Sequence, residues 1–194
     1  TGYTYTGYSV SGSLSEISGS TNTRILTTLG NSAGTITLNS KINTHTVTYD
    51  YKTNGGTSST KTSASVNYNS LVDLSVKATK SDWTFVGWNT DKNATSGLSS
   101  YTMTDADVTL YAIYKKEAIT YTVTFNKNGA LSQTNSAGIS VTDSTVTRTC
   151  TIAEVYNNSS QGTSCNITSP TIVGSSNTPT VVGYATSNAA TSSS

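Results

Sequence analysis

The side chains that could do chemistry are few in this sequence. His45 is the only histidine, and it begins a Thr-rich segment with no second histidine or Cys–His pair close to it. A Ser-His-Asp triad built on His45 is conceivable, because a histidine can act as a general base near neutral pH. We interpret His45 instead as a surface histidine, and we predict that the chain has no catalytic residue.

Metal binding has equally little support. Structural zinc takes four nitrogen or sulfur ligands, and one histidine with two cysteines leaves a ligand missing. Calcium takes oxygen ligands, and Asp105-Ala106-Asp107 could supply them, although no EF-hand or similar calcium repeat surrounds it. A solvated turn is our interpretation of Asp105 and Asp107, with calcium as the alternative. We predict no metal site and no cofactor.

The two cysteines, Cys150 and Cys165, enclose the segment of residues 151–164. We interpret the pair as one disulfide, which requires that the chain works outside the cytosol, where disulfides persist. Two free buried thiols are the alternative. We expect the bridge to join two adjacent strands, or a strand and a loop, with a turn at residues 157–162.

The chain's two tryptophans flank a glycine in the segment of residues 83–88. Aromatic and β-branched residues suit a strand, and Gly87 suits a bulge or a close backbone approach. We predict that Trp83, Phe85 and Trp88 are core residues, because aromatic side chains usually anchor a core that has few other large residues. An exposed platform for carbohydrate is the alternative.

The elements around this segment form a recognisable order. Residues 45–51, 61–68 and 108–114 alternate and read as strands, and Asn54-Gly55-Gly56 reads as a turn. Leu71, Leu74 and Ala78 have helical spacing, although the valines among them would also suit a strand. We predict a mainly β fold, α+β at most, made of tandem small β-grasp-like repeat domains.

Three segments of this middle region resemble a known family: TVTYDYKTNGGTSS at residues 46–59, TFVGWNTDKNAT at 84–95 and DVTLYAIY at 107–114. They are similar to the B repeat of bacterial internalins, also called the Listeria–Bacteroides repeat. The sequence departs from the family at Trp83, where a tyrosine after a glycine is usual, and at residues 77–80, where a proline is usual. The resemblance implies a small β-grasp-like module of extracellular bacterial proteins, without catalytic residues.

The same patterns recur more weakly on both sides. Residues 3–8 parallel residues 83–88, residues 35–38 parallel residues 108–110, and residues 121–129 parallel residues 45–55. We therefore predict a partial repeat (its second half) at residues 1–43, a complete repeat at 44–118 and a divergent repeat with the Cys150–Cys165 disulfide at 119–194. Ser/Gly-rich residues 9–19 read as a loop, and residues 24–30 as a helical turn or short strand.

Composition narrows the class of protein. Eleven basic and ten acidic residues give a net charge of +1, without the basic stripe that a nucleic-acid binder needs. No apolar run is long enough for membrane insertion. The chain begins inside a motif, so we expect it to be a fragment of a longer protein.

We predict a non-catalytic extracellular module, on the bacterial cell surface or secreted, which acts as a stalk or spacer or as part of an adhesin. The alternative is a module that binds a glycan or a protein of a host or neighbouring cell, favoured if Tyr111, Tyr114 and Tyr121 form an exposed patch. A further alternative is a surface fibre subunit, because the incomplete repeats at the two ends would leave open sheet edges. An enzyme would need a pocket where His45 meets acids.

Overall fold

The computed structural model of this 194-residue chain describes residues 2–12, 14–19, 24–28 and 33–173. Within those residues every regular element is a β-strand, which confirms the prediction of a mainly β fold. Thr, Val, Ile and Tyr alternate along most strands, because β-branched and aromatic side chains suit a pleated surface. The described part of the chain contains no helix that could cross a membrane.

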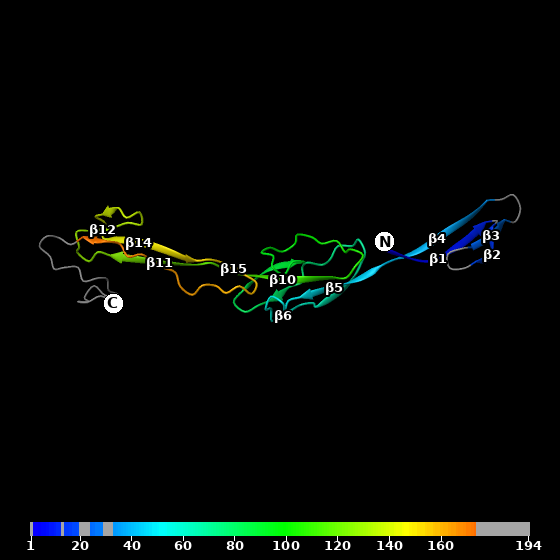
Figure 1. The fold of residues 1–194 in the computed structure, drawn as a ribbon, viewed down its shortest axis with the longest axis horizontal. Coiled ribbons are helices and arrows are strands. Elements are labelled where there is room, and N and C mark those ends of the chain that lie inside the picture. The colour runs from blue at the N-terminus through cyan, green and yellow to red at the C-terminus, as the bar shows by residue number, and fades with distance from the viewer. Residues whose placement is uncertain (1, 13, 20–23, 29–32, 174–194) are drawn as a thin grey trace. The chain divides into compact units, whose positions relative to one another are not determined.

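The chain divides into two compact units, Thr1–Tyr114 and Lys115–Ser194; in Figure 1 the colour of the first runs from blue to green and that of the second from green to orange. The predicted boundary after residue 43 lies inside the first unit. The division into three repeats stays a prediction, and each unit is described below by itself.

The sheet of the first unit is built around two parallel strands. β5 (Thr44–Asp50) lies between β7 (Ser63–Asn67), which runs antiparallel to it, and β10 (Val108–Lys116), which runs parallel to it. The parallel register places Val47 opposite Val108 and Tyr49 opposite Leu110. β9 (Thr84–Asn89) also pairs with β10, and β6 (Ser58–Ser59) pairs with β8 (Ala78–Thr79) beside the sheet.

The helix suggested by Leu71, Leu74 and Ala78 is wrong. Residues 71–77 form no helix; Leu71 makes an isolated bridge to Thr102, and the Val72 amide donates to the carbonyl of Tyr101. The physical reason is that this segment finds its hydrogen bonds on a neighbouring segment, and its two valines suit extended backbone better than helix. The β-grasp-like description, which includes a helix, therefore stays unconfirmed.

The core of the first unit lies where alternate residues of β5 and β10 face the crossing segments. Val47 and Tyr49 point to the same side as Leu110, Ala112 and Tyr114, as the period of a strand requires. The remaining buried members come from β8, β9 and the loops: Val72, Val76, Ala78, Trp88 and Met103. This one cluster holds nearly all the large buried side chains of the first unit.

An antiparallel ribbon precedes this sheet. β1 (Tyr3–Gly12) pairs with β4 (Gly34–Ile42), with a bulge between Tyr5 and Gly7. β2 (Leu14–Gly19) pairs with β3 (Arg24–Thr28). The predicted loop at residues 9–19 is therefore wrong, because Val10 and the serines around it continue the alternation of β1 and pair with β4. For residues 24–30 the sequence allowed a helical turn or a short strand, and residues 24–28 form the strand.

The second unit is also built from hairpins. β11 (Ile119–Asn126) and β14 (Thr145–Ile152) form a long antiparallel pair. β12 (Ser132–Thr134) pairs with β13 (Ser140–Val141) and with β16 (Ile172–Val173). β15 (Val155–Tyr156) pairs with Lys115 and Lys116 at the end of β10. Asn128 and Gly129 both adopt positive φ in the turn after β11, as such tight turns require.

Candidate functional site

The histidine and the two aspartates singled out in the sequence lie together. Nε2 of His45 is 2.9 Å from Oδ1 of Asp105, and Nδ1 of His45 is 3.7 Å from Oδ1 of Asp107. His45 stands near the start of β5, and the bend at Asp105-Ala106-Asp107 leads directly into β10. Because β5 and β10 are parallel neighbours, their amino ends bring the three side chains to one end of the sheet.

Asp105 is the centre of this cluster. Its Oδ2 accepts a hydrogen bond from the Gly2 amide at 2.6 Å, and its Oδ1 accepts one from Nδ2 of Asn43 at 2.8 Å as well as facing His45. The hydrogen bonds from Asn43, Gly2 and His45, in that order, lower the pKa of Asp105 to about 2. An ionised carboxylate with several donors is held in its charged form.

Asn43 is the single residue between β4 and β5. Both its backbone and its side chain are hydrogen-bonded. Its amide donates to the carbonyl of Gly2, its carbonyl accepts from the amide of Tyr68, and its Oδ1 accepts from Oγ1 of Thr4 at 2.6 Å. The cluster therefore joins the β1–β4 ribbon to the repeat through Asp105 and Asn43. Sequence reasoning missed this role, because Asn43 and Asp105 are 62 positions apart.

The hydrogen bonds of this cluster link neighbouring elements of the first unit. Both ring nitrogens of His45 face carboxylate oxygens, whereas a general base must offer one ring nitrogen to the group that it deprotonates. Asp107 also accepts a hydrogen bond from the Thr46 amide at 2.7 Å. Both carboxylate oxygens of Asp105 and Oδ1 of Asp107 therefore already receive hydrogen bonds from the protein. Within the described residues no group of three or more His, Cys, Asp or Glu side chains could hold a metal ion.

The sequence also contains a pattern that surrounds the nucleophilic serine in some hydrolases. Residues 30–34 read Gly-Asn-Ser-Ala-Gly, which matches the Gly-x-Ser-x-Gly pattern of hydrolase nucleophile turns. In those enzymes the pattern joins a strand to a helix, whereas here it lies between the strands β3 and β4. The serine of the pattern, Ser32, lies outside the described residues, and the pattern alone carries no assignment.

The three aromatic residues predicted as core differ in burial. Trp88 is 1% exposed, and Phe85 and Trp83 are half-buried against the same cluster. The ring of Trp88 packs edge-on against Tyr49 and Phe85, with centroids 5.1 and 5.5 Å away. These contacts leave Trp88 inaccessible to a carbohydrate.

Trp83 lies beside Lys80, a contact that the sequence analysis did not predict. Nζ of Lys80 is 3.8 Å from the centroid of the Trp83 ring and donates a hydrogen bond to the Asn54 carbonyl at 3.0 Å. Burial lowers the pKa of Lys80. The side chain of Asn54 is buried and donates to the carbonyls of Lys92 and Ala112, both at 2.9 Å. Asn54 was predicted only as a turn residue, but its side chain also links the turn to β10 through the bond to Ala112.

Tyr111, Tyr114 and Tyr121 do not form the exposed aromatic patch that would favour a binding module, because Tyr114 is not exposed. Tyr114 is fully buried in the core of the first unit, and burial raises its pKa to about 12. Tyr111 is half-buried, and Tyr121 is exposed on β11. The most exposed tyrosines of the first unit are instead Tyr3 and Tyr5 on β1.

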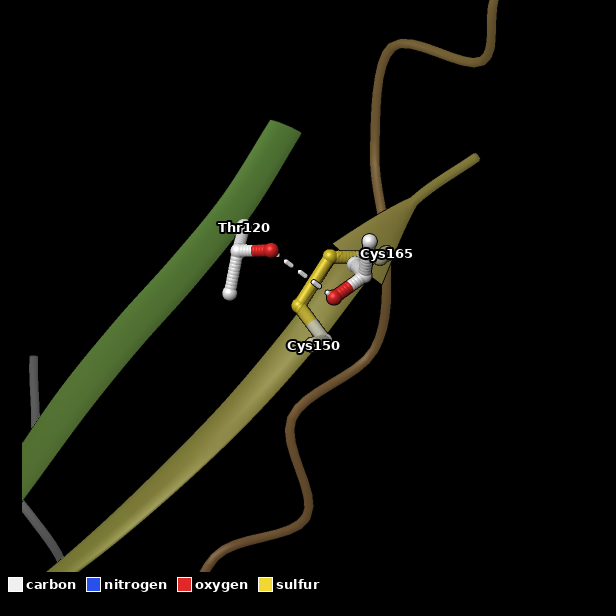
Figure 2. The surroundings of a disulfide bond; sticks show 4 residues. Thr120, Cys150 and Cys165 are labelled. Carbon is white, nitrogen blue, oxygen red and sulfur yellow. Dashed lines mark hydrogen bonds between the residues drawn. A yellow bond between two sulfur atoms is a disulfide. The ribbon is translucent and has the colours of Figure 1, made fainter. Parts of the chain in front are cut away.

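The two cysteines form a disulfide, with an S–S distance of 2.04 Å and a Cα–Cα distance of 6.0 Å. Figure 2 shows Cys150 on β14 and Cys165 on a loop, with Thr120 of β11 on the other side of the bridge. Oγ1 of Thr120 and Oγ1 of Thr151 are 3.0 Å apart across the same pair of strands. The bridge thus joins a strand and a loop, which was one of the two expected arrangements.

The comparisons with known proteins point to one family. A family model described as the Listeria-Bacteroides repeat domain matches residues 45–113. Searches of curated proteins and of solved structures found no match. The repeat is typical of bacterial surface proteins, and a disulfide fits an extracellular location. The segment from β5 to β10 is therefore the part of the chain that matches the Listeria-Bacteroides repeat domain.

Proposed function

We propose that this chain is a non-catalytic extracellular module of a bacterial surface protein, acting as a stalk or spacer or as part of an adhesin. The observation that carries the proposal is the match of residues 45–113 to the surface repeat family. The polar cluster of that segment supports it, because Asp105 accepts hydrogen bonds from Gly2 and Asn43, and His45 makes its own hydrogen bond with Asp105. Those bonds hold neighbouring elements together, as a spacer requires.

The chemistry of the surface also supports a structural role. The ribbon and hairpins are rich in serine and threonine, and the charges nearly balance. Such a surface is hydrated without attracting polyanions. The Cys150–Cys165 bridge adds a covalent link in the second unit, and a disulfide persists outside the cytosol without further protection.

The experiment displays the full chain on a bacterial cell between a wall anchor and an epitope tag. Antibody-coated beads, which are too large to enter the surface layer, report how far the tag is held from the cell. The matched control carries the tag directly on the anchor. A spacer should increase bead capture, whereas equal capture with and without the chain would contradict the proposal.

A second candidate function is binding of a glycan or a host protein, and one observation favours it. Tyr3 and Tyr5 are 55% and 51% exposed on the same face of β1, and exposed aromatic rings can stack on sugars. The purified chain and its Tyr3→Ala/Tyr5→Ala variant should be compared on a glycan array and on immobilised host matrix proteins. Saturable binding that the variant loses would support this function over a spacer.

A further inference from the structure

The β1–β4 ribbon has the features of the second half of the repeat. Residues 3–8 have the pattern of residues 83–88, and Gly7 and Gly87 both adopt positive φ, at 135° and 151°. Each segment pairs with a strand that contains a β-branched residue, then Thr, then Leu: residues 36–38 in β4 and residues 108–110 in β10. The two pairs of strands therefore share a sequence pattern and a glycine with positive φ.

The bulge of β1 gives this ribbon one apolar face. Directly paired residues share a face, and the register pairs Tyr3 with Ile42, Tyr8 with Leu38 and Val10 with Ile36. The extra residue between Tyr5 and Gly7 keeps the tyrosines before and after it on the same side. The opposite face carries only polar residues and glycine: Thr4, Gly7, Ser9, Ser11, Thr35, Thr37, Asn39 and Lys41.

The equivalent leucines of the two pairs have opposite environments. Leu110 is fully buried, because β10 also pairs with β5 and the repeat covers it, whereas Leu38 is 74% exposed. Among the described strands, β4 pairs with β1 alone. The apolar face continues into the contact with the repeat, where the ring of Tyr3 packs edge-on against Tyr68, with centroids 6.1 Å apart. Leu38, together with Ile36, which is 45% exposed, therefore lacks the cover that Leu110 has in the repeat.

The second unit contains a strand that resembles β5, the strand that pairs in parallel with β10 in the repeat. β11 contains Thr122-Val123-Thr124-Phe125, which parallels Thr46-Val47-Thr48-Tyr49 of β5. β11 pairs antiparallel with β14, as β5 pairs with β7, but no described strand runs parallel to β11 as β10 runs parallel to β5. Val123 is 39% exposed, whereas its equivalent Val47 is fully buried.

We infer that β4 of one molecule pairs in parallel with β11 of a second copy, in the register that joins β10 to β5. In that register Ile36 lies opposite Val123 and Thr37 lies opposite Thr124, as Val108 lies opposite Val47 and Thr109 opposite Thr48. The pairing gives backbone groups of both strands hydrogen-bond partners, and it places Leu38 beside Phe125 as Leu110 lies beside Tyr49.

The contact uses β4 on one molecule and β11 on the other, so a pair of molecules still presents one β4 and one β11 to further copies. It makes the chain a head-to-tail assembling surface subunit. The inference goes beyond the proposed function, because a spacer works as a monomer, and a monomeric chain would leave the bead-capture result untouched.

The experiment measures the weight-average mass of the full chain by sedimentation velocity over a concentration series. Leu38→Lys places a charge on the β4 face, and Val123→Lys places one on the β11 face. Each variant alone should stay monomeric. An equal mixture of the two should form a heterodimer that grows no further, because one variant retains β11 and the other retains β4.

The matched controls are Thr37→Lys and Thr122→Lys, which put lysine on the polar sides of the same two strands and should assemble like the natural sequence. Circular dichroism checks that every variant keeps its strands. A natural chain that stays monomeric at all concentrations would overturn the inference. Assembly that survives both Leu38→Lys and Val123→Lys, or a mixture that stays monomeric, would overturn it too.

Discussion

The indole Nε1 of Trp88 donates a buried hydrogen bond to the carbonyl oxygen of Val76 at 2.7 Å. This bond joins β9 to the extended segment that takes the place of the expected helix. The Trp88 ring also fills the space beside Tyr49. The tryptophan therefore both packs the core and satisfies a carbonyl that would otherwise be buried without a partner.

Replacing Trp88 should lower the stability of the first unit more than any exposed change. Trp88→Ala removes a fully buried ring and its hydrogen bond, and such substitutions cost about 3–5 kcal/mol. A thermal melt followed by circular dichroism measures the loss. Leu71→Ala is the matched control, because Leu71 is 72% exposed and should melt like the natural sequence. An unchanged melt for Trp88→Ala would contradict its place in the core.

Gly87 should not tolerate a side chain. A Cβ on Gly87 would lie 2.9 Å from the Cα of Gly97, and its φ of 151° is one that other residues rarely adopt. Gly87→Ala should therefore cost more than about 1 kcal/mol. Gly7→Ala separates the two causes, because Gly7 also has positive φ but has no atom within 4 Å of the Cβ position. Denaturant melts should show the larger loss for Gly87; equal losses would refute the close approach.

The local elements of the repeat could be predicted from sequence, because their signals are local. Residues 45–51 alternate, and β5 forms there; Asn54-Gly55-Gly56 reads as a turn, and Gly55 adopts positive φ. A glycine inside a run of aromatic and β-branched residues predicted a bulge or a close backbone approach at Gly87, and Gly87 does lie close to Gly97. In each case neighbouring residues carry the information.

The pairing of distant segments could not be predicted. Val47 and Val108 are partners in a parallel pair, and alternation alone gives no register between strands so far apart. The His45–Asp105 contact follows from that register. Leu71 and Leu74 looked helical because spacing alone cannot tell a helix from an extended segment whose hydrogen bonds lie elsewhere.

Breaking the disulfide should destabilise the second unit. The bridge closes a loop with a sequence separation of 15, and a loop of that size is worth about 3 kcal/mol in the chain-entropy model. Cys150→Ser/Cys165→Ser should lower the denaturant midpoint by a corresponding amount. A thiol-reactive dye added to the unfolded, unreduced chain gives an independent measurement. Two reactive thiols per chain would show that no bridge forms.

The hydrogen bonds of Asp105 between the ribbon and the repeat should make the stability of the first unit depend on pH. The pKa of Asp105 is lowered from 3.8 to about 2 in the folded chain, so the folded state binds a proton there less readily than the unfolded state does. The resulting stabilisation is present in full above the ordinary pKa of 3.8. It is lost as the pH falls through that value towards 2.

Asp105→Asn should therefore be less stable than the natural sequence at neutral pH, and the difference should shrink as the solution is acidified. Urea melts of both chains between neutral and acidic pH measure that difference, and the NMR shift of the Asp105 carboxyl carbon measures its pKa directly. The Gly2 amide should become less protected from hydrogen exchange in the variant, because it loses its carboxylate acceptor. A carboxyl that titrates at its ordinary value, with Gly2 exchange unchanged, would show that Asp105 does not hold the ribbon.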